Sequence, residues 1–94
     1  MSYEVEQQQK TIPKDKLGIK IYSPFKIFYD GIGSSLSAAN DTGPFDILPG
    51  HHNFISLVKP GLIIVRDAKG EQKFEVSRGV LHVKSNSITV FLDV

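Results

Sequence analysis

The feature that most constrains this chain is the alternation of apolar and polar residues along short segments. Leu17, Ile19 and Ile21 share one face of the first segment, and apolar residues again recur at every second position in residues 88–94. Successive side chains point to opposite faces of a β-strand, so this period indicates strands with one face in a core. No segment sustains helical spacing, and the sequence therefore predicts an all-β fold.

Turn-forming residues separate the alternating segments at short intervals. Examples are Pro49-Gly50, Lys59-Pro60-Gly61 and Ser85-Asn86, all of which favour tight reversals. The predicted strands are residues 17–22, 25–30, 32–38, 45–48, 53–58, 62–66, 73–77, 80–84 and 88–94, with a break at Gly31. About eight to nine short strands without helices predict a two-sheet antiparallel β-sandwich or flattened barrel.

Two phenylalanines do not fit the simplest alternation. Phe25, Ile27 and Tyr29 would form the more apolar face of the second strand, which places Phe28 on the other face. Phe91 likewise lies on the less apolar face of the last strand. These two rings either cover a second edge of the core or add to an exposed docking patch, and the sequence leaves both alternatives open.

The Pro49-Gly50 turn joins two apolar segments. Because proline fixes φ and glycine accepts unusual backbone angles, the pair favours a sharp reversal. We expect Ile47 and Leu48 before the turn, and Phe54 and Ile55 after it, to enter a common core.

Residues 1–16 differ from the rest of the chain. They are rich in Glu, Gln and Lys, contain Pro13 and lack a sustained apolar period. We therefore expect a flexible polar N-terminal extension, followed by one β-sandwich domain over residues 17–94. The composition, 40% hydrophobic and 22% charged over 94 residues, suits one small domain.

Charge and composition exclude several classes of function. The net charge is +1 without a basic cluster, which argues against a nucleic-acid partner. The chain contains no cysteine, so disulfide and thiol chemistry are excluded. No apolar run approaches the roughly 18 residues of a membrane helix, and direct membrane insertion is not expected.

Catalysis and metal binding find little support. His51, His52 and His82, with Asp46, are the only candidate ligand set. We expect His51 and His52, as adjacent strand residues, to point to opposite faces, so that they cannot easily share an ion. The sequence also lacks a serine-nucleophile elbow and a phosphate-binding loop. We therefore expect no catalytic residue, no metal and no cofactor.

Four short motifs carry a family resemblance. Residues 43–51, GPFDILPGH, resemble the G-x-F-x-I-L-P-G-H motif of ATP synthase ε subunits, which are called δ in mitochondria. Residues 59–61 match the K-P-G turn of that family, residues 76–83 resemble V-S-G-G-F-L-E-V, and residues 88–93 resemble V-T-V-L-A-D. The motifs occur in the same order and cover essentially residues 17–94, which makes the combination far more specific than any one of them.

The resemblance implies a non-catalytic central-stalk subunit of a rotary F-type ATP synthase. Such a subunit docks onto the γ subunit and the c ring, couples proton translocation to ATP synthesis, and lies at the cytoplasmic face of the membrane. By position, Ser23 and His51 are expected to face γ. The residues expected to face the c ring are Asp41, Thr42, Gly43, Pro44 and Phe45. The alternative is a stand-alone protein-binding module with the same fold.

The chain departs from the family pattern at several positions. Pro44 stands where an acidic residue is usual, and Asp41 could substitute for that charge. Arg78 replaces the first glycine of V-S-G-G, so a side chain has to fit at that bend, and His52 and Asn53 replace A-P. The helices that follow V-T-V-L-A-D in bacterial relatives have no counterpart before Val94, so we expect neither their inhibitory role nor specific ATP binding.

Overall fold

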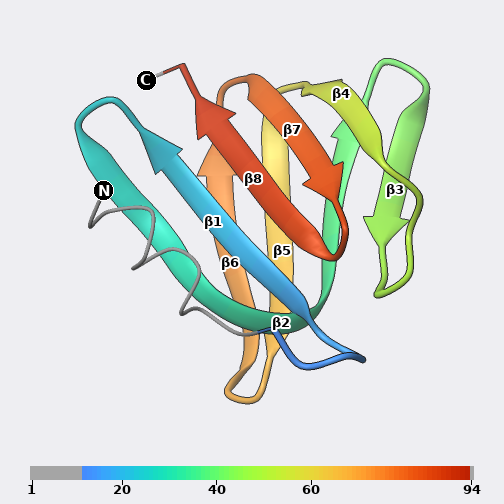
Figure 1. The fold of residues 1–94 in the computed structure, drawn as a ribbon. Helices are drawn as coiled ribbons and strands as arrows, with labels where there is room; N and C mark the ends of the chain where they lie inside the picture. Colours follow the sequence, from blue (N-terminus) through green and yellow to red (C-terminus); the bar gives the residue numbers. More distant parts are fainter. Residues whose placement is uncertain (1–11, 94) are drawn as a thin grey trace, which may run out of the picture.

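Eight strands account for most of residues 12–93, the part of the chain that the computed structural model describes (Figure 1). Their bounds are β1 Leu17–Ser23, β2 Lys26–Asn40, β3 Gly43–Ile47, β4 Phe54–Val58, β5 Gly61–Asp67, β6 Gly70–Val76, β7 Gly79–Lys84 and β8 Ser87–Leu92. The predicted all-β class and the predicted number of strands are confirmed.

The two layers of the sandwich are halves of one curled sheet. The strand order is β4-β7-β8-β1-β2-β5-β6, and β3 pairs with β2 beside this path. Figure 1 shows β7, β8 and β1 lying across β5 and β6, with β2 curving from one layer into the other. The predicted antiparallel arrangement holds except between β1 and β8, which are parallel.

The predicted break at Gly31 is wrong, because β2 runs through this residue and is 15 residues long in total. The first part of β2, up to Gly33, pairs with β1, and the part after Gly33 pairs with β5. A Cβ at Gly33 would lie 2.9 Å from the carbonyl oxygen of Arg66 and 3.0 Å from Cδ1 of Ile19. A glycine here therefore lets two neighbouring strands approach closely where β2 passes between layers.

A β-bulge reverses the predicted faces at the start of β2. Ile21 pairs with Tyr29 but Tyr22 pairs with Ile27, so Phe28 is an extra residue on its strand. Phe28 and Tyr29 consequently both pack against the core. Ile27 is 57% exposed and Phe25 is 89% exposed, contrary to the predicted alternation. Of the two open alternatives, Phe28 covers an edge of the core, whereas Phe91 remains exposed.

The core consists of aliphatic side chains from both halves of the sheet. The fully buried residues are Leu17, Ile19, Ile21, Leu36, Ile47, Ile63, Val65, Leu81, Val83, Ile88, Val90 and Leu92. Burying each of them stabilises the fold by about 1.5–3 kcal/mol relative to an exposed side chain. Around Pro49-Gly50, Ile47 is buried as predicted, but Leu48 and Ile55 are exposed, since successive side chains face opposite ways.

Residues 1–11 lie outside the described part of the chain, so the predicted N-terminal extension stays a prediction. From Ile12 onward the chain makes defined contacts. The Lys16 N–H donates to the carbonyl oxygen of Pro13 at 3.0 Å, and the Ile12 side chain lies against Gly18.

The bend before β7 explains why one glycine of the family motif is kept and the other is not. A Cβ at Gly79 would overlap the carbonyl oxygen of Phe91 and lie 3.0 Å from Cδ2 of Leu92. Arg78 has an exposed side chain and a negative φ, and its carbonyl oxygen accepts the N–H of Asp93 at 3.1 Å. The arginine is therefore accommodated, while the glycine is required by the neighbouring strand.

We expect Gly79→Ala to lower the free energy of unfolding by about 1–3 kcal/mol, because β7 and β8 would have to separate to admit the methyl group. Arg78→Gly at the adjacent position is the matched control and should change stability by less than about 1 kcal/mol. Urea unfolding followed by circular dichroism measures both. Equal stability of the Gly79→Ala variant and the wild type would contradict the close approach.

Candidate partner-binding surface

The predicted site residues lie at the two ends of the sandwich. Strand β1 runs in parallel with β8, which begins directly after Asn86. We call the side where β1 begins the Asn86 end, since the Gly18 N–H donates to the Asn86 carbonyl oxygen at 2.9 Å. The side where β1 terminates is the Ser23 end. Because β1 has 7 residues, the two ends lie about 20 Å apart.

His51 lies at the Asn86 end, in the loop between β3 and β4. The Gly50 N–H donates to Oδ1 of Asn86 at 2.8 Å, and the Ser85 N–H donates to Oδ1 of Asn53 at 3.3 Å. Ser85 and Asn86 have φ values of 51° and 64°, as a type I′ hairpin turn requires. This turn thus holds the histidine loop in place by side-chain hydrogen bonds.

The two adjacent histidines lie side by side. The rings of His51 and His52 stack with centroids 4.4 Å apart, and Nδ1 of His51 is 2.8 Å from the carbonyl oxygen of His52. Both rings make edge-on (T-shaped) contacts with the ring of Phe54. The centroid of the Phe54 ring lies 5.6 Å from that of Phe45. The expectation that the histidines point to opposite faces is therefore wrong, because they belong to a loop and not to a strand.

Ser23 lies at the opposite end and is only 6% exposed. Its Oγ accepts the N–H of Phe25 at 3.4 Å, which helps to hold the turn between β1 and β2. A partner at this position would meet the exposed ring of Phe25 rather than the serine hydroxyl.

The predicted ring-facing segment forms the turn between β2 and β3. Asp41, Thr42 and Pro44 are exposed, and the Thr42 N–H donates to Oδ1 of Asn40 at 2.9 Å. Gly43 has a φ of 130°, which favours glycine. Phe45 is half-buried and packs against Phe54, so its ring belongs to the inside of the sandwich.

The structure brings together only some of the predicted residues. The turn at Asp41 lies beside the end of β4, because the Lys59 N–H donates to the carbonyl oxygen of Ala39 at 3.0 Å. At that end of β4, Val58 pairs with Gly79, and Gly79 pairs with Leu92. Leu92 directly follows Phe91, which pairs with Tyr22 next to Ser23. Asp41 and Ser23 thus share one end, and His51 lies at the other. The assignment of Ser23 and His51 to one partner stays a prediction.

Sequence reasoning missed an exposed apolar row across five strands. Leu57 pairs with Val80, Val80 with Phe91, Phe91 with Tyr22, and Tyr22 with Ile27. Leu57 is 71% exposed, Val80 and Phe91 are also exposed, and Tyr22 is half-buried and packs edge-on against Phe91 at 5.2 Å. These five side chains form the apolar row, which crosses the outer face of β4, β7, β8, β1 and β2.

The outer face of the other layer is more polar. Nη1 of Arg66 donates to Oγ of Ser37 at 2.9 Å and to Oγ of Ser35 at 3.3 Å, while Nε forms a 3.1 Å ion pair with Glu71. The Ser37 hydroxyl donates to Oδ1 of Asp46. These polar groups satisfy one another across β2, β3, β5 and β6.

Metal-ligating residues do not converge within residues 12–93, where no group of three or more His, Asp, Glu or Cys side chains could hold an ion. Over the same residues, no helix is long and apolar enough to cross a membrane.

The chain matches one protein family over nearly its whole described length. Residues 16–94 match the family model for the β-sandwich domain of the ATP synthase delta/epsilon chain. This chain belongs to that family. The motifs in the sequence and the curled sheet with its β3–β4 loop are thus features of one known domain.

Named relatives agree with this assignment. The chain is 40% identical over 78 residues to the ATP synthase epsilon chain of Psychrobacter arcticus and 31% identical over 78 residues to that of Leptospira borgpetersenii. These matches cover 82% and 83% of the chain but only 56% and 61% of the relatives, so the chain spans little more than half of their length.

Two solved assemblies contain chains with the same fold. A chain of the Euglena gracilis mitochondrial ATP synthase superimposes with a TM-score of 0.77 at 16% identity, covering 89% of this chain and 54% of the other. A chain of the Tetrahymena thermophila mitochondrial ATP synthase central stalk and c ring gives 0.72 at 18% identity, covering 89% and 67%.

One titratable pair links the two layers at the side of the sandwich. The Tyr29 hydroxyl donates to Oδ2 of Asp67 at 2.7 Å, joining β2 to the β5–β6 hairpin. Burial, and then the hydrogen bond to the Asp67 carboxylate, raise the pKa of Tyr29 to about 12. The same hydrogen bond lowers the pKa of Asp67.

We expect the stability of the wild type to decrease between pH 10 and about pH 12 through Tyr29, because the unfolded state loses the tyrosine proton first. Tyr29→Phe removes this contribution, so its stability should decline less over that interval. Urea unfolding at matched pH values measures both proteins. Identical pH profiles would contradict a protonated Tyr29 bound to Asp67.

Proposed function

We propose that this chain is a non-catalytic rotor subunit of an F-type ATP synthase, which docks onto the γ subunit and the c ring and helps couple proton translocation to ATP synthesis. In this role the chain is a peripheral subunit at the cytoplasmic face of the membrane. Family membership supports the role, and the observation that carries the docking step is the apolar row.

The apolar row has the properties of a protein interface. It joins aliphatic and aromatic side chains from five neighbouring strands into one surface, whereas scattered apolar residues are ordinary on any protein. Burial of aromatic and aliphatic anchors at the centre of an interface commonly provides most of the binding energy. The more polar outer face of the opposite layer is less suited to this role.

The position of the row also gives a path between the two predicted γ-facing residues. It crosses the sheet one residue before Ser23, and Ile55 extends it along β4 towards His51. Ile55 is 69% exposed and lies between Leu57 and the histidine loop. A single γ subunit lying along β4 and β7 would contact the apolar row, the turn at Ser23 and the loop at His51.

The c ring would contact a different part of the Ser23 end, namely the turn between β2 and β3. Asp41, Thr42 and Pro44 form an exposed polar turn with one acidic side chain, as expected for contact with another protein loop. Pro44 removes the acidic side chain usual at its position, which leaves Asp41 as the anionic group of this turn. A close-packed sandwich held between γ and the ring deforms little and suits a part that transmits torque.

The alternative is a stand-alone binding module that uses the apolar row for a partner outside the ATP synthase. The two functions differ in whether the γ subunit binds to the apolar row.

We expect Leu57→Lys combined with Val80→Lys to weaken binding to the γ subunit of the same organism at least about tenfold, because two charges would be buried in the interface. Leu62→Lys on the outer face of β5 is the matched control, since Leu62 is similarly exposed and lies opposite Glu75. Calorimetric titration with a γ–c-ring complex and thermal melting measure both properties. Full affinity of the double variant, with a normal melting temperature, would rule out the apolar row as the γ-binding surface.

A second substitution tests the residues predicted from the sequence. We expect His51→Ala together with Asp41→Lys to weaken assembly with γ and the c ring, while the melting temperature stays close to that of wild type. Loss of a packed interface group commonly costs about 2 kcal/mol or more, whereas an exposed substitution changes stability by less than about 0.5 kcal/mol. Lys69→Ala in the β5–β6 hairpin is the control. Normal assembly of the double variant would show that neither loop takes part.

A further inference from the structure

Strand β6 ends the sheet with an edge that has little protection. Over residues 12–93 it is the last strand and pairs only with β5. It runs from Gly70 to Val76 without a proline or a bulge, the features that commonly keep other strands away from such an edge. The charged side chains of β6 therefore decide which strand pairs with it.

The backbone groups that face the free edge belong to three charged residues. The β5–β6 hairpin has a two-residue loop, so the residues that flank the loop, Asp67 and Gly70, form a hydrogen-bonded pair. Backbone groups alternate in direction along a strand, and those of Glu71, Lys73 and Glu75 therefore point away from β5. The side chains of these three residues are exposed.

A second copy of β6 fits this edge only in particular registers. In a two-fold antiparallel pair, Glu71, Lys73 and Glu75 have to lie opposite one another, because their backbone groups make the new hydrogen bonds. The register with Lys73 opposite Lys73 also brings Glu71 opposite Glu75, and like charges repel in both pairs. The neighbouring registers, with Lys73 opposite either Glu71 or Glu75, bring opposite charges together. The edge is thus complementary in charge to a second copy of itself.

The carboxylate of Glu75 favours one of the two attractive registers. Glu71 is already held by its own chain, 3.1 Å from Nε of Arg66 and 3.9 Å from Nζ of Lys73. Glu75 makes no ion pair within the part of the chain that the structure describes. Opposite Glu75, Lys73 of a second copy would gain a new ion pair, whereas opposite Glu71 it would compete with Arg66.

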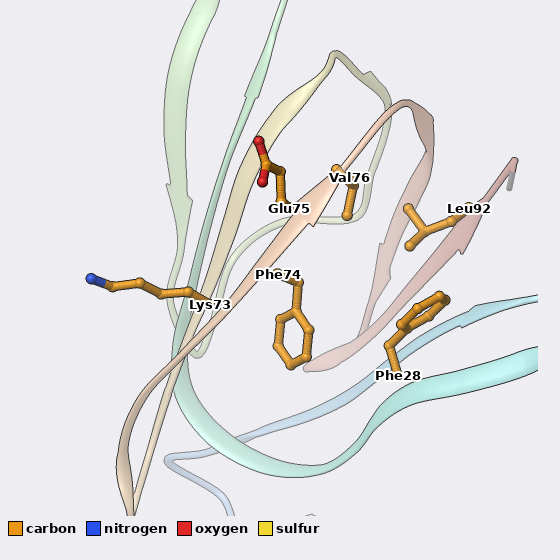
Figure 2. Close-up of a pocket in the computed structure, with 6 residues that line it drawn as sticks. All are labelled: Phe28, Lys73, Phe74, Glu75, Val76 and Leu92. Atoms are coloured by element: carbon orange, nitrogen blue, oxygen red, sulfur yellow. The ribbon is translucent and has the colours of Figure 1, made fainter.

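The same register covers an apolar hollow beside β6. The hollow has a volume of about 410 Å³, and Figure 2 shows the four apolar side chains around it, Phe28, Phe74, Val76 and Leu92. The rings of Phe28 and Phe74 pack against the core but are only partly buried. In the register favoured by Glu75, Phe74 of a second copy lies directly opposite Phe74 on the same inner face, and its ring covers the mouth of the hollow. In the other attractive register Gly70 takes that place, and the hollow stays open.

We propose that two copies of this chain associate through β6, paired as antiparallel strands about a two-fold axis at Phe74, with Lys73 of each copy opposite Glu75 of the other. The two sheets then form one continuous sheet, in which each copy closes the free edge of the other. The apolar row lies on strands of the other layer and stays exposed, so this inference does not depend on the proposed function. Interfaces of so few residues are weak, and we expect a dissociation constant on the order of 0.1 mM.

Sedimentation equilibrium and amide hydrogen exchange of the full chain at low salt test the pairing. The measured mass should rise from one chain towards two as the concentration increases from about 10 µM to about 1 mM, a range that brackets the expected dissociation constant. Over the same range the amides of Lys73 and Glu75 should exchange at least about threefold more slowly, whereas the amide of Phe74, which points towards β5, should not change. A single-chain mass at the highest concentration would overturn the proposal, as would a dimer in which the first two amides exchange at an unchanged rate.

Charge-reversed variants test the register. Lys73→Glu and Glu75→Lys each bring like charges together on both sides of the two-fold axis, so each variant alone should dimerise at least about tenfold more weakly than wild type. An equal mixture of the two variants restores opposite charges in both pairs and should regain the mass of a dimer. Lys69→Glu, in the hairpin loop outside the paired residues, is the matched control and should dimerise as wild type does. A mixture that stays monomeric would rule out the proposed register, as would an equal loss of dimers in the Lys69→Glu variant.

Discussion

The passage of β2 between the two layers is the constraint on which the rest of the structure depends. This one strand pairs with β1, β3 and β5, so the layers cannot slide or separate without breaking its hydrogen bonds. Its curvature brings the aliphatic face of β1 and β8 over that of β5, which creates the core. Gly33 allows the close approach at the bend, and the bulge at Phe28 directs two rings inward at the edge.

Much of this fold could be predicted from the sequence because alternation and turn chemistry are local. Residues 88–92 and the Ser85-Asn86 turn are examples in which period and backbone preference agree with the structure. The faces of β2 could not be predicted, since a bulge depends on how β1 pairs with it. The break predicted at Gly31 is wrong for a similar reason. A glycine between two apolar segments either ends a strand or lies within it, and only the neighbouring strands decide which.

The candidate surface was less predictable than the fold. The turn at Asp41 and the loop at His51 were identified through family motifs, and both contain exposed polar residues. Ser23 is buried, and its position matters through the turn that carries Phe25. The apolar row is formed by residues far apart in the sequence, from Tyr22 to Phe91, so it appears only when the register of five strands is known.

The two outer faces of the sandwich differ in how far the chain satisfies them by its own contacts. A domain of this size buries a limited core, and its net stability is a small difference between large opposing terms. The hydrogen bonds and ion pair of Arg66 satisfy polar groups of one outer face within the chain. The apolar row on the other face consists of exposed or half-buried side chains, whose burial against a partner would be favourable. Since a ligand of the folded state stabilises it by mass action, docking through that row would add to folding as well as to assembly. Under the proposed function, the domain would then be most rigid when this surface is occupied by its partner.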